Sequence, residues 1–377
     1  MQNQNGVTLT EAHEQWRDRP ADERFESMAT LKAAVQGRRM RSRAVDVTTE
    51  GMGAKLDDGR LVINGKTSPV EPSHWSFGQL STMLKAPAGY LRTLPAPLLV
   101  DNLNNGFKNA GREAVKFMTI TAADEDPSPV NRLQAVTSTT YGRIWDADVV
   151  DCILRIQEKT GGRFHNPLAY QKGSFGGEAR PSGLYASDHD MFAFLIDGGS
   201  LLESGPRATF HRGFCVWNSE TGSRTFGLLT FLFNKACGNH FIYGATDISR
   251  LIIRHSSGGP YRFDSEAAPQ LLAYANQSAG AELDVIRRAQ AALLPETFNR
   301  NAPKLEDLTP WVLKHGKFSR AEISSAVDFA KAEEGECKTV FHLMQGFTAY
   351  ARGYDYIDAR VDLETRAGKF MQSATNS

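Results

Sequence analysis

Residues 208–244 read ATFHRGFCVWNSETGSRTFGLLTFLFNKACGNHFIYG, and residues 249–262 read SRLIIRHSSGGPYR. Aromatic, β-branched and basic residues alternate more densely in these two segments than elsewhere in the chain. Such alternation is typical of β-strands, because successive side chains point to opposite faces of a sheet. We therefore expect the central sheet here, and its surface is the first candidate for a binding face.

Two shorter segments within this region carry their own signals. Residues 218–223 are polar and contain a glycine, which predicts a reversal between two strands. Residues 228–237 fit either a strand or a helix, because a short apolar run has no distinctive period. We expect a strand to about Leu229, followed by a short helix that ends at Gly238.

The neighbouring segments extend the predicted sheet. Residues 191–196 are apolar on both faces, which predicts a central strand that is buried on both sides. Residues 115–121, 132–138 and 248–255 also alternate like strands. The sequence therefore predicts one mostly antiparallel sheet over residues 115–256.

Helical patterns flank this sheet at residues 76–110 and 265–365. Two helix starts have the capping-box spacing of a serine followed three residues later by Glu or Gln, and a third has an aspartate at the N-cap position. These starts are Ser76 with Gln79, Ser319 with Glu322, and Asp146. The fold class that follows is α+β, a mostly antiparallel central sheet flanked by helical groups.

The pattern along the chain predicts three regions. Residues 1–50 are expected to form a peripheral helical arm, and residues 51–300 the α+β core domain. Residues 301–377 are expected to form a C-terminal helical subdomain with a disordered tail from Gln372. Arg38, Arg39, Arg41 and Arg43 end the arm, where they either contact phosphate or complement a helix C-terminus.

Composition excludes several classes of protein. The 377 residues are 41% hydrophobic and 23% charged, with a net charge of zero, so no global field attracts nucleic acid. We expect no signal peptide and no membrane span, because no apolar run approaches the required length. The four cysteines have no C-x-x-C spacing, which favours buried thiols. A cytoplasmic location follows as an expectation.

Residues 207–262 are locally basic, with seven Arg and Lys against two acids and a net charge of +5. Aromatic residues are interleaved with them. Proteins that bind single strands combine a cationic groove with aromatic platforms for bases. The alternative is a sheet with its aromatic residues in the core and its arginines in water. The candidate nucleic-acid-binding residues are Arg207, Arg212, Arg224, Lys235, Arg250, Arg254, Arg262 and Trp217.

Histidines and cysteines of the same region allow two other hypotheses. His211 and Cys215 lie four residues apart, and Cys237 and His240 lie three apart. If the four converged they could bind zinc, or a cysteine and a histidine could form a nucleophilic pair. The spacing is not that of a standard zinc motif, and no orienting Asp or Asn is identifiable. We therefore expect neither a metal nor a cofactor.

Acidic residues allow a hydrolase as a further alternative. Asp188 and Asp190 flank His189 and could bind a divalent cation. Asp148 and Asp151 follow Asp146 in the expected helix. A solvated loop and acids that complement a helix dipole explain the same residues without any chemistry.

The order of five segments over roughly residues 60–300 resembles domain-of-unknown-function family 932, a family of prophage and plasmid genes. The segments are Phe77-x-x-Leu80 to Leu103-Asn104, Val136-Thr-Ser-x-x-Tyr141, Arg212-Gly213-Phe214 with residues 218–222, Phe231 to Asn239, and Arg254-His255. The resemblance implies a mobile-element context and no established activity.

A second resemblance rests on the order strand, Ser219-Glu220-x-Gly222, helix, Gly238-Asn239. It is similar to the core of single-strand annealing recombinases, which hold single-stranded DNA on a β-β-β-α unit. Our first hypothesis is thus a non-enzymatic protein that binds single-stranded DNA or RNA in recombination or replication. The alternatives are an interaction or anti-defence factor that binds a host protein, and a metal-dependent hydrolase. Self-association is compatible with each, and no membrane partner is expected.

Overall fold

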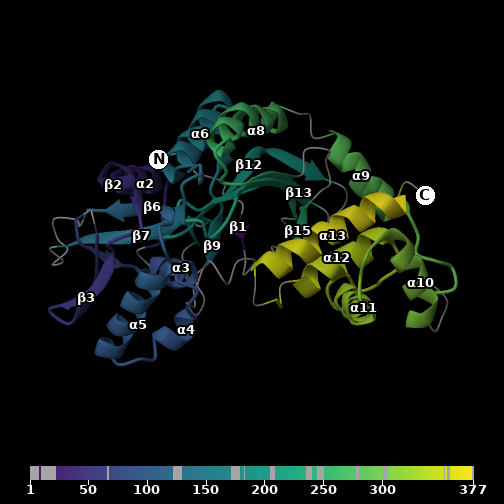
Figure 1. The fold of residues 1–377 in the computed structure, drawn as a ribbon. Coiled ribbons are helices and arrows are strands. Elements are labelled where there is room, and N and C mark those ends of the chain that lie inside the picture. The colour runs from purple at the N-terminus through teal and green to yellow at the C-terminus, as the bar shows by residue number, and fades with distance from the viewer. Residues whose placement is uncertain are drawn as a thin grey trace.

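The computed structural model describes residues 8–9, 23–65, 68–121, 130–170, 179–181, 183–203, 209–234, 240–243, 250–276, 280–299, 304–351, 353–354 and 357–375. Within these residues the chain forms two large sheets and one small one, with helices around them (Figure 1). The predicted α+β fold is confirmed. The small sheet combines β1 (Thr8–Leu9), β9 (Leu168–Tyr170) and β10 (Ala179–Pro181).

The first large sheet has six strands among the described residues, in the order β2-β6-β7-β5-β4-β3. All of its pairs are antiparallel except β5 with β7. Its strands are β2 (Ser42–Thr48), β3 (Gly53–Asp57), β4 (Arg60–Asn64), β5 (Val70–Pro72), β6 (Ala114–Ile120) and β7 (Asn131–Ser138). The helices α3 (His74–Met83), α4 (Ala88–Leu91) and α5 (Ala96–Asn109) pack with it around a core that includes Leu80, Leu103 and Phe117.

The second large sheet has seven strands in the described part of the chain, and all of its pairs are antiparallel. Its strands are β8 (Phe164–His165), β11 (Leu184–Ala186), β12 (Met191–Glu203), β13 (Thr209–Asn218), β14 (Phe226–Asn234), β15 (His240–Tyr243) and β16 (Arg250–Ile253). The path runs β11-β12-β13-β14-β15, with β8 beside β12 and β16 beside β14. Residues 191–196 are at most 3% exposed and pair on both sides, so the predicted central strand is confirmed.

Two expectations about the sheets are wrong. The single sheet expected over residues 115–256 is two sheets, because β6 and β7 pair with β2 and β5 rather than with later strands. The strand expected to stop near Leu229 continues to Asn234. Backbone pairing with β13 on one side and β15 on the other keeps residues 230–234 extended. Tertiary pairing thus overrides the ambiguous local pattern.

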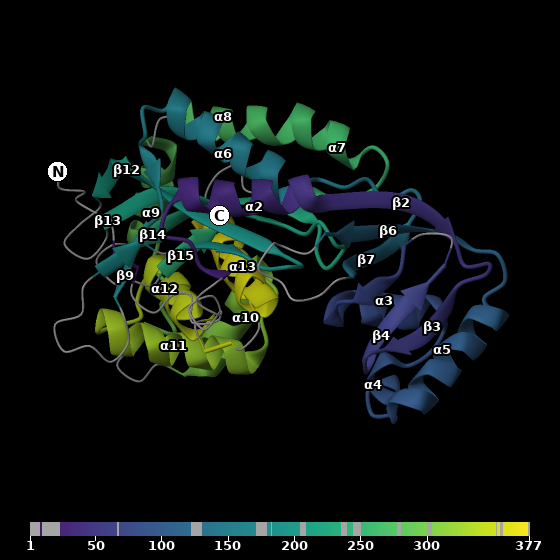
Figure 2. The same cartoon turned by 90° about the vertical axis from the view of Figure 1, so that its left-hand side faces the viewer.

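Helices cover the seven-stranded sheet, with α2 (Met28–Arg41), α6 (Asp146–Lys159) and α8 (Ala268–Asn276) side by side in Figure 2. Met28, Leu31 and Val35 of α2 are buried in the same core as α6, because they recur on one face of the helix. Residues 28–48, expected to be peripheral, therefore supply a core helix and then strand β2. The short helices α7 (Gly259–Arg262) and η2 (Phe263–Ala267) lead from β16 into α8.

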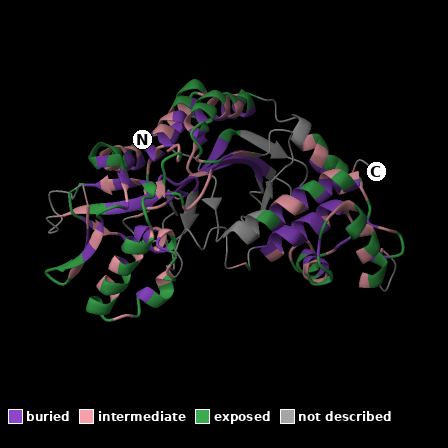
Figure 3. Ribbon diagram, viewed as in Figure 1, coloured by how far each residue is buried: buried purple, intermediate pink, exposed green. Residues whose placement is uncertain are grey.

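The C-terminal helices form a separate core. They are α9 (Gly280–Ala291), α10 (Leu305–His315), α11 (Arg320–Glu334), α12 (Val340–Ala351) and α13 (Ile357–Thr375). Phe210 of β13 and Leu232 of β14 belong to this core, so these helices pack on the seven-stranded sheet (Figure 3). Helix α13 extends through Gln372 to Thr375, where the sequence predicts disorder, because Met371 and Ala374 are buried against its neighbours.

Helix caps agree with the sequence at one of three positions. The capping box of Ser319 and Glu322 is present at the start of α11. Helix α3 begins earlier than expected, with Ser73 rather than Ser76 as its N-cap. Helix α6 has Trp145 as its N-cap, which makes Asp146 the first residue inside the helix.

Candidate functional site

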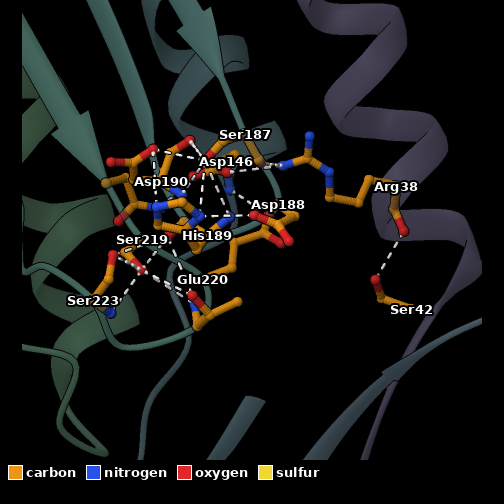
Figure 4. A network of polar contacts seen from close by, with 12 residues as sticks. Arg38, Ser42, Asp146, Ser187, Asp188, His189, Asp190, Ser219, Glu220 and Ser223 are labelled. Carbon is orange, nitrogen blue, oxygen red and sulfur yellow. Dashed lines mark hydrogen bonds and ion pairs between the residues drawn. The ribbon is translucent and has the colours of Figure 1, made fainter. Parts of the chain in front are cut away.

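Three buried carboxyl groups gather where the two large sheets meet (Figure 4). Asp146 begins α6, Asp190 lies in the turn between β11 and β12, and Glu220 lies in the turn between β13 and β14. Each is 2–3% exposed. We call these three residues the carboxylate cluster. Arg38 of α2 approaches it, with its Nη1 3.9 Å from Asp146 Oδ2.

Local hydrogen bonds shape the turn between β11 and β12. The Ser187 N–H donates to the Asp190 carbonyl at 2.8 Å, and the Asp190 N–H donates to Ser187 Oγ at 3.0 Å. Ser187 Oγ also donates to Asp190 Oδ1 at 2.7 Å. A serine and an aspartate three residues apart thus close the turn with their own side chains. His189 lies at its tip, where its imidazole is within 2.7 Å of Asp188 Oδ1.

Three hydroxyl groups join the second turn to the first. Ser219 Oγ, Thr221 Oγ1 and Ser223 Oγ donate to the His189 carbonyl at 2.6, 3.2 and 3.0 Å. Gly222 allows this compact turn because its φ of 86° lies in the left-handed region. These hydrogen bonds therefore hold the two turns together.

One direct hydrogen bond joins Asp146 to Glu220, and Asn218 binds the Asp146 carboxyl group. The Asp146 N–H donates to Glu220 Oε1 at 2.8 Å, and Asn218 Nδ2 donates to Asp146 Oδ1 at 2.7 Å. The Arg143 guanidinium donates to the Glu220 carbonyl. Both carboxyl groups are therefore fixed by neighbours from distant parts of the chain.

Burial changes the acidity of both groups. Burial, together with the nearby Asp146 carboxylate, raises the pKa of Glu220 from 4.5 to about 8. Burial likewise raises the pKa of Asp146 from 3.8 to about 6. The two interacting groups titrate in two steps that belong to the pair. Both carboxyl groups therefore bind a proton more tightly than a solvent-exposed carboxyl group does.

Several buried polar atoms around the cluster have no protein partner within the described residues. They are Asn218 Oδ1, Arg143 Nη2 and His255 Nε2. Burial lowers the pKa of His255 to about 4, so its imidazole is neutral at pH 7. The ring stacks on Tyr141 at 5.1 Å, and Tyr141 in turn donates to the Ser219 carbonyl at 3.0 Å. These contacts tie the segment before α6 to the second turn.

An open groove lies beside this region. Its volume is about 660 Å³, and we call it the α3 groove. It is bounded by one face of α3, by Ala88 and Arg92, and by β6 and β7. The lining residues are His74, Trp75, Gly78, Gln79, Thr82, Met83, Ala88, Arg92, Val115, Val136, Thr137 and Ser138.

Two side chains of α3 connect the groove to the carboxylate cluster. Trp75 Nε1 and Gln79 Nε2 donate to the Thr221 carbonyl at 3.2 and 2.7 Å. Gln79 Oε1 accepts from the Val136 N–H at 2.9 Å, which also fixes it to β7. The Trp75 indole stacks on His189 with ring centres 5.9 Å apart.

The described residues around His189 do not form a nucleophilic site. Ser187 Oγ and Asp188 Oδ1 both contact His189 Nδ1, whereas a Ser-His-Asp triad needs them on opposite ring nitrogens. Burial raises the pKa of the Cys215 thiol well above its usual value, so it is protonated at pH 7.

The described residues do not form a metal-binding site. No group of three or more His, Cys, Asp or Glu in the described chain is arranged to hold an ion. Cys237, one of four residues in the zinc hypothesis, lies outside the described residues. His211 is buried, and its Nδ1 lies 3.2 Å from the Asp197 carbonyl.

The sequence-predicted basic residues do not form one face in the part of the chain described. Arg212 is 1% exposed, with its guanidinium 4.2 Å above the Tyr274 ring and its Nη2 donating to the Tyr274 carbonyl at 2.7 Å. It is therefore a core residue rather than a solvated one. The reason is that Tyr274 of α8 supplies both an aromatic face and an acceptor, neither of which adjoins Arg212 in sequence.

The other candidates are scattered. Arg224 lies 3.6 Å from Asp190, and Arg262 forms an ion pair with Glu266. Arg254 is exposed beyond the end of β16. Trp217 is half-buried, with its ring over Gly227. Arg207 and Lys235 lie outside the described residues, as does the side chain of Arg250.

The sequence did not reveal the carboxylate cluster or the α3 groove. Asp146 and Glu220 each have an ordinary local explanation, as a helix-start acid and a turn residue. Trp75 carries no motif at all. The capping-box spacing of residues 76–79 and the segment Phe77-x-x-Leu80 both fall in α3, but neither predicts a groove.

Comparisons with known proteins give no relative. No family model matches the chain, and no curated protein or solved structure is similar to it at a significant level. The described helices include none that is both long enough and apolar enough to cross a membrane. The resemblance to the prophage and plasmid family therefore has no independent support.

Proposed function

We propose that this protein binds single-stranded nucleic acid and that the α3 groove accepts an unpaired base. The observation that carries the proposal is the composition of the groove. It combines the indole of Trp75 and apolar side chains with the guanidinium of Arg92. Among its lining residues, all of which the structure describes, there is no carboxylate. Such a lining favours a ligand that is flat, partly apolar and negatively charged.

The dimensions and polar groups fit that chemistry. Small-ligand sites typically span about 300–1,000 Å³ and are mostly apolar with a few placed polar groups. The groove has a volume of about 660 Å³. Thr137 and Ser138 also line it, and the buried Thr137 Oγ1 has no hydrogen-bond partner within the described residues. Because the groove is open to solvent, a polymer can pass through it.

Arg92 is placed to meet a phosphate. It is exposed, its Nη2 donates to the His74 carbonyl at 2.9 Å, and its guanidinium lies 5.1 Å above the Phe77 ring. These contacts hold the planar group at the groove without neutralising its charge. A fixed guanidinium suits phosphate oxygens better than a mobile one.

A role in recombination or replication of a mobile element, in the cytoplasm, belongs to the same proposal. It is supported only by the two resemblances described above. We propose binding without catalysis, because Ser187 Oγ and the Asp188 carboxylate contact the same ring nitrogen of His189 rather than opposite ones.

Fluorescence anisotropy with a labelled oligothymidylate of about 20 nucleotides tests the proposal, because single-strand sites span about 4–16 nucleotides. The wild type is expected to bind the single strand more tightly than a duplex of equal length, and more weakly as salt rises. Arg92→Ala should weaken binding and reduce the slope of log K against log salt by about 0.7 for each lost phosphate contact.

Arg254→Ala is the matched control, since Arg254 is also exposed but lies away from the groove lining. Loss of affinity in this variant alone would move the interface to the sheet predicted from the sequence. If the wild type binds neither strand form even at low salt, the proposal fails and a host protein becomes the better candidate partner.

A further inference from the structure

We propose that strand β2 is an interface with a second copy of this chain, in which the β2 strands of the two copies pair antiparallel across a two-fold axis at Val45. Strand β2 is the first strand of the six-stranded sheet and continues directly from α2 (Figure 2). Among the described strands it pairs only with β6, so its other edge is open. The interface does not depend on nucleic-acid binding.

The ladder between β2 and β6 fixes which residues of β2 face outward. At one end of the ladder the Thr121 N–H donates to the Arg41 carbonyl at 3.1 Å, and at the other end the Thr49 N–H donates to the Glu113 carbonyl at 3.0 Å. Hydrogen-bonded pairs alternate with non-hydrogen-bonded pairs along an antiparallel ladder, so the odd-numbered residues of β2 bond to β6. The backbone N–H and C=O groups of its even-numbered residues therefore face away from the sheet.

Ala44 and Asp46 present such outward groups at the middle of the edge. Both residues are exposed. Their backbone N–H and C=O groups have no hydrogen-bond partner within the described residues. Ser42 differs, because its N–H donates to the Arg39 carbonyl and its carbonyl accepts from Arg43 Nη1 at 2.9 Å. The free part of the edge therefore begins at Ala44.

The opposite edge of the same sheet is protected. Strand β3 is the last strand on that side. Asn104 of α5 bonds both backbone groups of Ala54, since its Oδ1 accepts from the N–H at 2.7 Å and its Nδ2 donates to the carbonyl at 3.0 Å. A side-chain amide thus takes the place of a neighbouring strand. An edge without such protection is a template for pairing with another strand, and β2 is such an edge.

The centre of β2 is complementary to itself, which identifies a second copy as the partner. If Ala44 of one copy lies opposite Asp46 of the other, each such pair exchanges two main-chain hydrogen bonds, and the two-fold axis generates the pair twice. Val45 then faces its own symmetry mate as a non-hydrogen-bonded pair, whose side chains lie closest together in an antiparallel sheet. Val45 is 44% exposed in the single chain, so this pairing buries apolar surface.

The neighbouring registers are less favourable. In one direction Asp46 would lie opposite Asp46 of the other copy, and like charges directly opposite each other are destabilising. In the other direction Asp46 would pair with Ser42, whose backbone groups are already bonded within its own chain. In the favoured register Asp46 faces Ala44, and Lys116 Nζ lies 3.9 Å from its carboxylate as a counter-charge. The chain has no net charge, so two copies do not repel each other.

Sedimentation velocity over a wide range of protein concentration tests the interface. A contact limited to one strand is small, so the wild type is expected to change from one chain to two as concentration rises. Val45→Lys should remain a single chain over the same range, because it sets two ammonium groups opposite each other at the axis. Leu56→Lys, at an exposed position of the protected strand β3, is the matched control and should associate as the wild type does.

Ala44→Pro is a second, independent variant. The Ala44 N–H faces outward, so proline removes a main-chain donor from the interface and leaves the ladder with β6 intact. This variant should associate more weakly than the wild type at an unchanged melting temperature. Melting temperatures of all variants close to that of the wild type show that each one folds.

A charge-swap experiment tests the two-fold pairing itself. Fluorescently labelled Val45→Lys protein is titrated with unlabelled Val45→Glu protein, so that opposite charges meet at the axis. Association of the labelled chain should be restored, whereas titration with unlabelled Val45→Lys protein should leave it a single chain. A wild type that remains a single chain at every concentration would overturn the proposal. A wild-type dimer without this rescue would overturn it too, because the contact would then lie elsewhere.

Discussion

The N–H of Asp146 donates to Glu220 Oε1 at 2.8 Å, although the two residues lie 74 positions apart in the chain. Asp146 is the first residue of α6, whose N-cap Trp145 makes no side-chain capping bond. Glu220 therefore caps α6 from another part of the fold. This tertiary cap joins the helix to the turn between β13 and β14, and through Thr221 that turn is joined to α3.

Among the residues that make these contacts, we expect Gln79 to contribute most to the free energy of unfolding. Gln79→Ala leaves the buried Val136 N–H without its acceptor and removes one donor from the Thr221 carbonyl. An unsatisfied buried group costs about 1–3 kcal/mol, so the free energy of unfolding in urea should fall by that amount. Thr82→Ala, at an exposed position of the same helix, should change it by no more than about 0.5 kcal/mol. Equal effects of the two substitutions would argue against the link.

Arg212 and Arg254 should behave in opposite ways. Arg212→Ala removes a buried side chain together with its contacts to the Tyr274 ring and carbonyl. Truncating a large buried side chain costs about 2–5 kcal/mol, and we expect a loss in that range. Arg254→Ala should change stability by less than about 0.5 kcal/mol. Chemical denaturation of both variants measures the contrast, and a stable Arg212→Ala protein would place Arg212 at the surface after all.

Two helix glycines offer a test of the C-terminal packing. A Cβ at Gly346 of α12 would lie 1.9 Å from the Ala326 carbonyl oxygen of α11, so Gly346→Ala should destabilise the protein by about 1–3 kcal/mol. A Cβ at Gly37 of α2 would meet nothing within 4 Å. Gly37→Ala should therefore stabilise it, by up to about 1 kcal/mol, because alanine is the better helix former. Thermal melts of the two variants that shift in the same direction would contradict this packing.

The sequence correctly predicted those features of the fold that depend on interactions between residues close together in the chain. The double-faced apolar run 191–196 is buried on both sides of a sheet, and Ser319 with Glu322 caps α11. Where the local signal was weak, tertiary pairing decided the outcome. Residues 230–234 are a strand because β13 and β15 hydrogen-bond to both of their edges.

The candidate site could not be predicted from the sequence, and the reason is physical. Arg38, Asp146 and Glu220 come from three segments, and each is unremarkable among its own neighbours in sequence. The acidity of the two carboxyl groups and the contacts of all three residues arise only when two sheets and a helix meet. The burial of Arg212 has the same origin, since its partner Tyr274 lies 62 positions away.

Photo-crosslinking of an oligonucleotide that contains 5-bromodeoxyuridine, followed by mass spectrometry of the peptides, tests the proposed function most directly. The account predicts crosslinks in α3 (His74–Met83), with Trp75 as the principal site, and their loss in a Trp75→Leu variant that still folds. Crosslinks confined to β13 or β16, or none under conditions of low salt, would contradict the assignment of nucleic-acid binding to the α3 groove.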